Sequence, residues 1–524
     1  VEESKSTTAR SLFFEDVTTR LNHTHHEVLF DDWSRQPSLP QRLSQLGPGL
    51  AWFDVNDDDR EDLIIGSGRG GAMAVFAGRE DGRFERLQDA LLNTPVSRDQ
   101  TTILGWRNPQ GQPVLLAGAA NYEDARPEGT LVQEYALAKG VLRERLPGAP
   151  FSVGPLALAD IEGDGDLDLF VGGRVVAARY PEPPASLLFR AKADSWVLDE
   201  DNSRQLTEVG MVSGAIWSDL TGDGLPELVL ACEWGPLRVF HNRSGQLEEV
   251  TKPWGLDRYR GWWNGVAAGD FDGDGRLDLV GSNVGRNTRF EPFRAKPIRL
   301  LYGDFNGVGS VEMLETYTHP DLPAEVPWRS LASVSQIMPF LREEYPTHRA
   351  YAEATVEEIL GERHAAARAL SATWFETTLF LNRNERFEPK PLPLEAQTSP
   401  AFGISVGDFN GDGSEDVFLS QNFFAVHPED SPYASGQGLW LTGAGQGGFR
   451  PVPASESGIA ITGEQRGCAT ADFDQDGRLD LAVTQNGGKT RLFRNAQATP
   501  GLRVRLMGTA GNPHSAGATL RIGY

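Results

Sequence analysis

Short hydrophobic runs alternate along the chain with clusters of acidic residues and glycine. The runs at 63–65, 169–171 and 228–230 each begin directly after such a cluster. Short apolar runs bounded by turn residues predict buried strands, not helices. Further strand-like runs that carry Phe or Leu follow around polar Gly/Asn turns, as at 75–84 and 239–247. Two hairpins in succession predict a four-stranded sheet, the unit of a propeller blade.

The acidic clusters are copies of one nine-residue pattern with oxygen-bearing side chains at positions 1, 3, 5 and 9. The copies begin at Asp54, Asp160, Asp219, Asp270, Asp304, Asp408 and Asp472. An eighth unit around 103–118 has the strand pattern without the acids. Repeats at this spacing predict an all-β fold, a β-propeller of four-stranded blades. Eight units favour eight blades, whereas seven is the commoner closure, so the sequence leaves both counts open.

Two features disturb the repeat. Only 34 residues separate Asp270 from Asp304, while 104 separate Asp304 from Asp408. Within the longer interval, apolar residues at helical spacing predict a small insertion of two short helices at about 329–370, packed over one rim. At the chain ends, 13–17 has the pattern of an outer strand, and the last blade, ending near Asn495, lacks one. We expect the N-terminal strand to complete that blade and close the ring.

The pattern predicts calcium loops, because calcium takes six to eight hard oxygen ligands. Side chains at alternate positions of a tight turn converge on one point, position 7 offers its backbone carbonyl, and position 9 closes the shell from the next strand. Glycine at positions 4 and 6 lets the backbone curl. The predicted ligands are Asp54, Asn56, Asp58, Arg60, Asp62, Asp160, Glu162, Asp164, Asp166, Asp168, Asp219, Thr221, Asp223, Leu225, Glu227, Asp270, Asp272, Asp274, Arg276, Asp278, Asp304, Asn306, Glu312, Asp408, Asn410, Asp412, Ser414, Asp416, Asp472, Asp474, Asp476, Arg478 and Asp480.

The alternative interpretation is that these are metal-free Asp/Gly turns. Repeated packing of three or four carboxylates into nine residues favours a cation, since the charges repel one another. We therefore predict about six Ca²⁺ sites and a seventh, weak one at Asp304, where Val308 replaces the acid at position 5. Six calcium ions would neutralise half of the formal net charge of −24.

Composition narrows the function. The excess of 73 acidic over 49 basic residues argues against a nucleic-acid partner. No apolar run is long enough for a transmembrane segment. Cys232 and Cys468 are the only cysteines, so a disulfide framework is excluded and both are expected to be small buried residues.

The acidic loops closely resemble FG-GAP/VCBS repeats, the blade type of integrin α-subunit propellers. The segment after Gly501 looks like the opening of an ASPIC/UnbV domain, which in that family would continue past residue 524. The resemblance implies a propeller over 1–500, an ASPIC/UnbV-like β segment over 501–524, and an exported protein in the secreted, periplasmic or cell-surface class. It also implies calcium-dependent adhesion or interaction with a protein or glycan partner, as a possible subunit of an extracytoplasmic or surface assembly.

Two clusters outside the loops are candidates for other chemistry. His23, His25, His26 and Glu27 form a transition-metal or acid/base site in one interpretation and a solvated loop in the favoured one. The tryptophans Trp234, Trp262 and Trp263 either bind a sugar or peptide or wedge between blades. No nucleophile or acid/base pair stands out, so we expect a non-enzymatic interaction scaffold. The alternative is a calcium-dependent polysaccharide lyase or hydrolase on the propeller.

Overall fold

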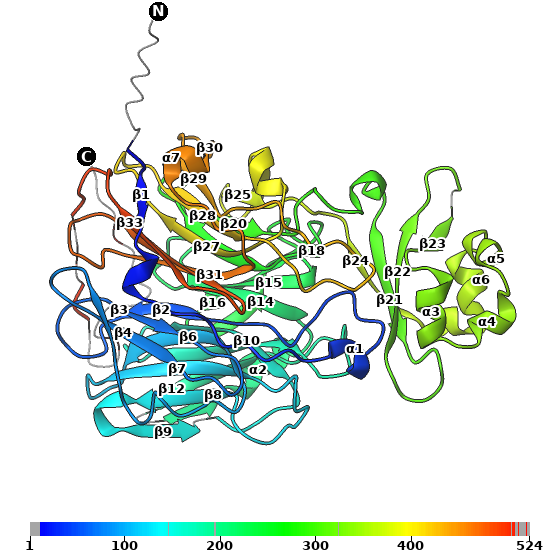
Figure 1. Cartoon of the computed structure of the whole chain (residues 1–524), viewed down its shortest axis with the longest axis horizontal. Coiled ribbons are helices and arrows are strands. Elements are labelled where there is room, and N and C mark those ends of the chain that lie inside the picture. Colours follow the sequence, from blue (N-terminus) through cyan, green and yellow to red (C-terminus); the bar gives the residue numbers. More distant parts are fainter. Residues whose placement is uncertain are drawn as a thin grey trace, which may run out of the picture.

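The computed structural model describes residues 11–144, 146–192, 195–322, 324–502, 504, 506–508, 512 and 520. Its strands form eight antiparallel sheets, each built on four strands (Figure 1). The predicted all-β, blade-built fold is confirmed. The β segment expected at 501–524 falls largely outside the described residues, and the described positions after Asn495 belong to no strand.

The first four blades follow the chain in order. Blade 1 consists of β2 (Leu50–Phe53), β3 (Asp62–Ile65), β4 (Ala74–Gly78) and β5 (Phe84–Arg86). Blade 2 consists of β6 (Asp99–Arg107), β7 (Pro113–Ala120), β8 (Val132–Ala136) and β9 (Val141–Glu144). Blade 3 consists of β10 (Ser152–Ala159), β11 (Asp168–Val175), β12 (Leu187–Lys192) and β13 (Ser195–Leu198). Blade 4 consists of β14 (Met211–Ser218), β15 (Glu227–Gly235), β16 (Leu237–Arg243) and β17 (Gln246–Glu249), with β18 (Gly261–Trp262) added beside β15.

The last three blades include one interrupted blade and one completed by the N-terminus. Blade 5 consists of β19 (Gly265–Gly269), β20 (Asp278–Ser282), β25 (Thr378–Asn382) and β26 (Phe387–Pro391). Blade 6 consists of β27 (Ala401–Gly407), β28 (Asp416–Gln421), β29 (Leu439–Gly443) and β30 (Phe449–Val452). Blade 7 consists of β31 (Gln465–Ala471), β32 (Asp480–Gln485), β33 (Arg491–Asn495) and β1 (Phe14–Asp16).

The ring has seven blades. The first strands contact one another in the order β2, β6, β10, β14, β19, β27 and β31, and β31 returns to β2. Of the two counts left open by the sequence, the smaller describes the ring. The predicted closure by the N-terminus is also present, because Phe14 of β1 pairs with Asn495 of β33. Such closure leaves no open edge between the first and last blades.

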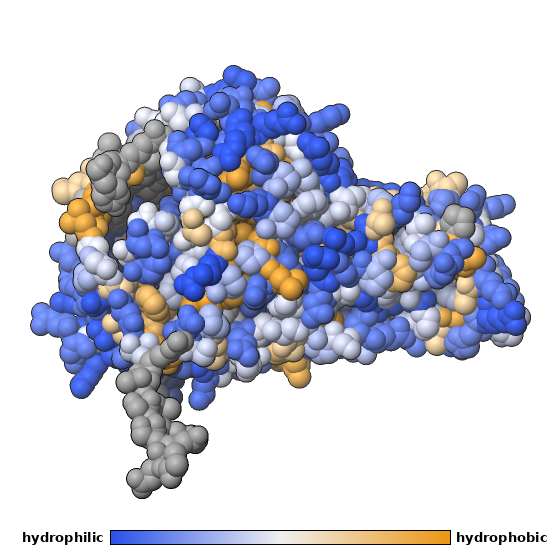
Figure 2. All heavy atoms as spheres, turned by 90° about the horizontal axis from the view of Figure 1, so that it is seen from above, coloured by the Kyte–Doolittle hydropathy of each residue, from blue (hydrophilic) through white to orange (hydrophobic). Residues whose placement is uncertain are grey.

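The eighth sheet lies outside the ring. It consists of β21 (Ile298–Gly303), β22 (Glu312–Thr318), β23 (Glu325–Pro327) and β24 (Arg368–Ala372), inserted between β20 and β25 of blade 5. Its strand β24 contacts β15 of blade 4. Figure 2 shows the insertion as a projection from the propeller body, with a mainly hydrophilic surface in view.

The helices expected over a propeller rim pack instead on this eighth sheet. Where two helices were predicted, the described residues form α3 (Leu331–Ile337), α4 (Leu341–Glu344), α5 (His348–Ala352), α6 (Val356–Leu360) and the 3-10 helix η4 (Gly361–Ala366). Buried Val334, Leu341 and Ile359 share one apolar cluster with Leu301 and Leu314 of β21 and β22. The prediction that they cover the rim was wrong, because the strands they cover are not part of the ring.

The remaining short helices lie in connections. They are η1 (Thr18–Arg20), α1 (Asp32–Arg35), η2 (Leu137–Lys139), α2 (Glu200–Gln205), η3 (Glu291–Phe293), η5 (Leu394–Gln397) and α7 (Ala454–Ser457). Among the described residues, no helix has the length and apolar character needed to cross a bilayer.

Candidate metal loops and a pocket on the opposite face

Every acidic loop joins the first strand of a sheet to the second. In the loop at 270–278, the carboxylate of Asp270 accepts hydrogen bonds from the backbone N–H groups of Asp274 (3.0 Å) and Gly275 (2.8 Å). Gly275 has a φ of 82°, in the left-handed region that favours glycine. The aspartates at position 1 of the other six loops accept from positions 5 and 6 in the same way. The position-1 side chain therefore shapes the turn before any ion is considered.

The acid at position 9 is buried and fastens the loop to the blade. Asp416 is fully buried. One oxygen accepts from Phe409 N–H (3.1 Å) at position 2, and the other accepts from Gly443 N–H (2.8 Å) on the third strand. Asp62, Asp278 and Asp480 bond both segments in the same manner. This position was predicted only as a metal ligand, but it also ties the second strand to the loop and to the third strand.

In two loops, the acids at positions 1, 3 and 9 converge. One oxygen each of Asp270, Asp272 and Asp278 lie within 4.8 Å of one another, and Asp472, Asp474 and Asp480 form an equivalent group. Position 5 takes no part in these groups. Its carboxylate accepts from the backbone N–H of position 7, as Asp274 does from Arg276 (3.0 Å).

An unpaired oxygen at position 3 is the feature of these loops that best fits a calcium ion. Oδ1 of Asp272, Oδ1 of Asp474 and Oγ1 of Thr221 are buried and have no hydrogen-bond partner among the described residues. A buried oxygen without a donor is unfavourable, and a hard cation would satisfy it. These acidic clusters have the composition typical of FG-GAP calcium loops.

Burial disfavours the charged form of the position-9 carboxyl groups when no cation is bound. Desolvation raises the pKa of Asp278 and Asp416 to about 7, and that of Asp480 to about 8. Desolvation also raises the pKa of Asp62 to about 6 and that of Asp168 to about 8. A bound divalent ion would favour the charged form of each group.

Arginines near the third strands supply part of the missing positive charge. Arg383, which follows β25, bonds to Asp272 (2.7 Å) and Asp274 (3.2 Å). Arg494 of β33 bonds to Asp474 (2.6 Å) and Asp476 (3.0 Å). These pairs were not predicted, because a guanidinium on a later strand carries no mark in the nine-residue pattern.

The loop at 304–312 belongs to the eighth sheet and is the least complete. Val308 at position 5 is 74% exposed, so nothing replaces the missing carboxylate. The Asn306 amide donates to the backbone carbonyl of Ile337 (2.6 Å) at the end of α3. The position-3 side chain is thus partly committed to a contact with helix α3. A weak seventh site stays a prediction.

A pocket lies at the opposite end of the blades. Its residues include Glu233 at the end of a second strand, and Asn264, Phe402 and Arg466 at or just before the start of first strands. The acidic loops leave from the other end of those strands. Residues in or beside the strands of blades 3 to 7 contribute, together with Glu315 of the eighth sheet, so the pocket does not belong to any single blade.

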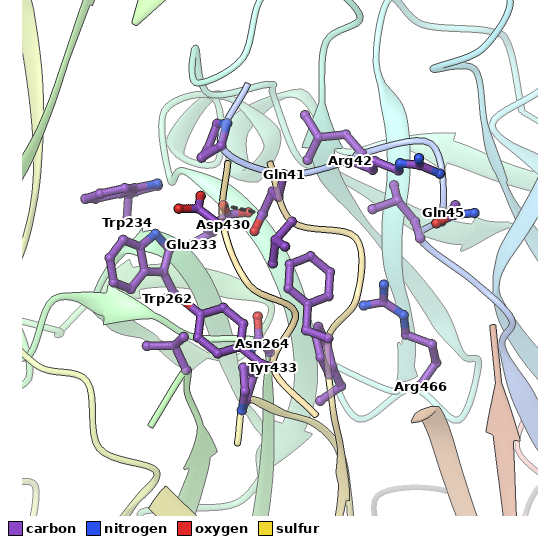
Figure 3. A pocket seen from close by; sticks show the side chains of 18 of the residues that line it. Gln41, Arg42, Gln45, Glu233, Trp234, Trp262, Asn264, Asp430, Tyr433 and Arg466 are labelled. Atoms are coloured by element: carbon purple, nitrogen blue, oxygen red, sulfur yellow. Dashed lines mark hydrogen bonds between the residues drawn. The ribbon is translucent and has the colours of Figure 1, made fainter. Parts of the chain in front are cut away.

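The connection between β1 and β2 forms one wall of this pocket. Figure 3 shows Gln41, Arg42 and Gln45 of this segment across from Trp262, Asn264 and Arg466. The Gln41 amide donates to Glu233 (2.9 Å), and the Tyr180 hydroxyl donates to the same carboxylate (2.7 Å). The Gln41 bond therefore fastens this segment to β15 of blade 4.

Trp234, Trp262 and Trp263 were predicted either to bind a ligand or to pack between blades. Trp234 and Trp263 are 2% and 0% exposed and pack in the core. Trp262 is partly exposed and lines the pocket, with its ring 4.4 Å from that of Trp234. Trp263 packs among residues of blades 4 and 5, which fits the wedge interpretation. Trp234 also lines the pocket but is almost fully buried, so Trp262 offers the more exposed surface to a ligand. The pocket arginines were missed. A signal existed for Arg466, which stands six residues before the first aspartate of a loop, as Asn264 and Phe402 do.

The histidine cluster is not the solvated loop that we favoured. His25 is 4% exposed and accepts from Gly487 N–H (3.1 Å), and His23 bonds to Thr490 (2.9 Å). Burial lowers the pKa of His23 to about 4 and that of His25 to about 3, so both are neutral. They attach the N-terminal segment to blade 7, while His26 is exposed. Within the described residues, no group of potential metal ligands includes any of these three histidines.

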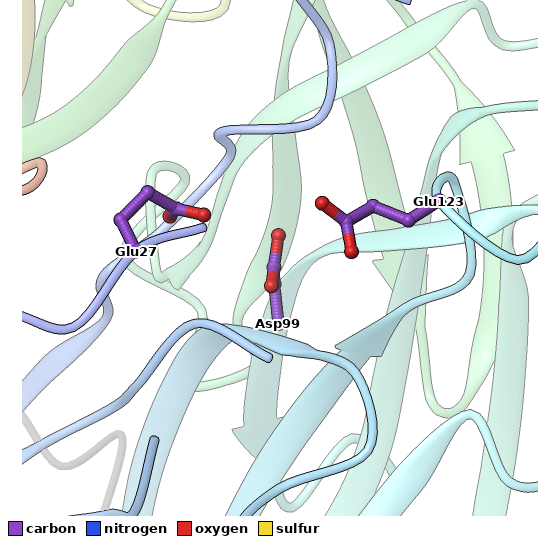
Figure 4. A group of neighbouring side chains, drawn as sticks. All are labelled: Glu27, Asp99 and Glu123. Atoms are coloured by element: carbon purple, nitrogen blue, oxygen red, sulfur yellow. The ribbon is translucent and has the colours of Figure 1, made fainter. Parts of the chain in front are cut away.

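A third acidic group was not predicted. Figure 4 shows Glu27, Asp99 and Glu123 turned toward one another, and one oxygen of each lies within 4.8 Å of the others. Arg69 pairs with Glu123, and its backbone N–H donates to Asp99 (2.7 Å). Burial raises the pKa of Glu27 to about 8 and that of Asp99 to about 7. These three oxygens could hold either shared protons or a cation. Only the fold unites them, since they come from three separate segments.

Comparison with known proteins agrees with this architecture. The FG-GAP-like repeat family matches residues 219–281, which run from the loop of blade 4 into β20 of blade 5. This segment matches the FG-GAP-like repeat, and the sheets of the chain are arranged as a propeller.

The chain is also a distant homologue of cartilage acidic protein 1. It is 23% identical to the human protein over 475 residues, which cover 82% of this chain and 63% of that relative. The mouse protein is 22% identical over 290 residues, covering 47% of this chain and 42% of that relative. The chain thus spans less than two thirds of these relatives. The crystal structure of the V. cholerae biofilm matrix protein Bap1 aligns over 96% of both chains, with 12% identity and a TM-score of 0.42.

Proposed function

We propose that the protein is a calcium-stabilised interaction scaffold that binds a protein or glycan partner through the face that carries the pocket. The observation that carries this proposal is the separation of two kinds of chemistry. The acidic loops leave from one end of the blades, and the arginine- and aromatic-lined pocket lies at the other. Calcium in the loops would hold each first hairpin in place and leave the opposite face for a partner.

The number of loops favours a place of action outside the cytoplasm. Extracellular calcium modules bind with dissociation constants of about 10⁻⁴–10⁻³ M, which only extracellular calcium saturates. Six structural sites of that kind would stay filled in a secreted, periplasmic or surface protein. The same setting suits a subunit of a surface or matrix assembly.

Binding is a better account of the site than catalysis. The pocket carboxylates are committed to ion pairs: Glu233 pairs with Arg174, and both Glu315 and Asp430 pair with Arg289. A general acid or base must exchange protons with substrate, and a carboxylate held by a guanidinium is a weak base. The polysaccharide lyase or hydrolase remains the competing proposal.

An array experiment tests the proposal. Calcium-loaded protein is applied to arrays of matrix proteins and polysaccharides, alongside Arg466→Ala in the pocket and Arg383→Ala on the loop face. We expect retained ligands that the pocket variant loses and the loop-face variant keeps. The soluble polysaccharides are also assayed for new reducing ends or unsaturated ends. Ligands that depend only on Arg383, or cleavage that Arg466→Ala abolishes, would refute the proposal.

A further inference from the structure

The pocket is locally positive in a strongly acidic protein. Four arginines line it, Arg42, Arg174, Arg289 and Arg466, against the three carboxylates of Glu233, Glu315 and Asp430. Arg289 bonds to both Glu315 (2.7 Å) and Asp430, so its charge is spent within the protein. Of the other three cations, Arg174 pairs with Glu233 and Arg466 pairs with the neighbouring Glu464, which leaves Arg42 as the cation in excess. A local excess of cations persists although the chain carries a formal charge of −24.

Two of these arginines keep donors without acceptors. Arg174 is 8% exposed, and its Nη1 has no hydrogen-bond partner among the described residues. The side chain of Arg466 is 11% exposed, and its Nε is likewise unpaired. Buried N–H groups are normally satisfied, so two of them lining one cavity indicate a missing acceptor.

Arg42 adds a cation with no acidic partner. Its guanidinium lies 5.1 Å from the centre of the Trp33 ring. Within the described part of the chain, no carboxylate pairs with it. Arg466 is similarly placed over the ring of Phe402, at 4.4 Å. A ring contact positions a guanidinium without using its N–H groups, so those of Arg42 and the Nε–H of Arg466 stay available to a ligand, while Nη2 of Arg466 bonds to Glu464.

The acceptor that best fits this set is a carboxylate, because planar guanidinium donors match its two oxygens. The cavity volume of about 90 Å³ is well below the roughly 300–1,000 Å³ of sites that enclose whole small molecules. It therefore suits one inserted group. The overall negative charge would repel a polyuronate along its whole length, whereas one carboxylate meets only the local excess of cations.

We propose that this pocket binds the carboxylate of an Asp or Glu side chain presented by a protein partner. The inference rests on the proposed interaction function and names the chemistry of the partner. Arg42, Arg174 and Arg466 would supply the donors, and Trp262 and Phe402 would bound the apolar part of the inserted side chain. Removal of the inserted carboxylate from water would strengthen each hydrogen bond that it accepts.

The test uses an array of capped pentapeptides that differ only at the central residue, applied to the calcium-loaded full chain. We expect peptides centred on Glu or Asp to be retained about tenfold better than their Gln and Asn counterparts, the value of one charge-assisted hydrogen bond. Arg42→Gln and Arg466→Lys should abolish that preference. The matched control is Arg363→Gln, because Arg363 also lies over an aromatic ring, that of Phe340 at 3.9 Å, but in the helical insertion.

Oligosaccharides with and without uronate carboxylates form the second arm. Uronate binding that Arg42→Gln abolishes, without any Glu preference, would overturn the inference of a protein partner and leave the interaction function standing. Binding of neutral peptides through the same pocket would overturn the carboxylate inference alone. If no peptide, oligosaccharide, matrix protein or polysaccharide binds, both this inference and the proposed function fail.

Discussion

The acid at position 9 has two assignable roles, metal ligand and backbone acceptor, and one substitution separates them. Asp416→Asn keeps the size of the side chain but places an amide N–H₂ where one oxygen accepts hydrogen bonds. Gly443 N–H lies 2.8 Å from one oxygen, and Phe409 N–H and Trp440 Nε1 lie 3.1 and 3.2 Å from the other. The substitution thus removes an acceptor and, if calcium binds, a ligand.

The two losses differ in size and in their dependence on calcium. A buried donor left unsatisfied costs about 1–3 kcal/mol, with or without the ion. A calcium ion at a free concentration 100-fold above its dissociation constant stabilises the folded state by about 2.7 kcal/mol. We expect the free energy of unfolding to fall by about 1–3 kcal/mol in chelator and by about 3–6 kcal/mol in saturating calcium. Burial raises the pKa of Asp416 to about 7, so the neutral amide recovers part of the loss in chelator.

Urea unfolding followed by tryptophan fluorescence, in calcium and in chelator, measures both values. The matched control is Asn108→Ala in the acid-free loop of blade 2, where the amide oxygen accepts from Gln110 N–H (3.1 Å) and Gln112 N–H (2.9 Å). Its effect should be the same in both solutions. Equal losses for Asp416→Asn in both solutions would refute the ligand role and leave a backbone staple. A loss confined to calcium would refute the staple.

Three further perturbations test other parts of the structure. Val308→Asp restores position 5 of the weak loop at a side chain that is 74% exposed, so calcium bound in equilibrium dialysis should rise by one per chain; an unchanged count would contradict the predicted ligand set. Glu27, faced by Asp99, Glu123 and Arg466, has its pKa raised by burial to about 8. The folded state therefore binds more protons than the unfolded state between about pH 4.5 and 8, and stability falls as pH rises through that window. Glu27→Gln should remove the contribution of Glu27 to that fall, so above pH 8 the free energy of unfolding of the variant should exceed that of the wild type by about 1–2 kcal/mol. Parallel curves of stability against pH for the two proteins would refute this. Phe14→Ala should lower the free energy of unfolding by about 3–5 kcal/mol, because Phe14 is 1% exposed and packs against Trp440 of blade 6, with the ring centres 5.6 Å apart. Leu394→Ala, at a side chain that is 68% exposed, should leave the melting temperature unchanged.

Features that depend on local spacing could be predicted from the sequence. The nine-residue pattern placed every acidic loop between two strands, including the one that ends at Glu227. The acid-free unit before Pro113 was recognised as a blade from its strands alone. The pairing of Phe14 with the last blade could be predicted because that blade lacked an outer strand and the N-terminal segment had the pattern of one. Each of these predictions needed only neighbouring residues and the rule that propellers close.

Features that depend on distant segments could not be predicted. The oxygens of Glu27, Asp99 and Glu123 meet only after the N-terminal segment crosses the ring. The burial of His25 likewise depends on its contact with blade 7, where Gly487 donates to it. The pocket arginines come from strand ends (Arg174, Arg466) and from connections (Arg42, Arg289), and nothing local distinguishes an arginine facing the pocket from one facing solvent.

The blade count shows why identical local chemistry can produce different topology. In the ring blades, the first strand is at the edge of its sheet, where it faces the axis and contacts the first strands of both neighbours. In the eighth sheet the order is β23–β22–β21–β24, so β24 pairs with the strand that would have faced the axis. The acidic loop there still joins β21 to β22, because its geometry depends only on those two strands. Which strand takes the other edge of β21 depends on the long connection through the helices. A loop pattern therefore counts first hairpins, and ring membership is decided by the strand that pairs on the far side of the first one.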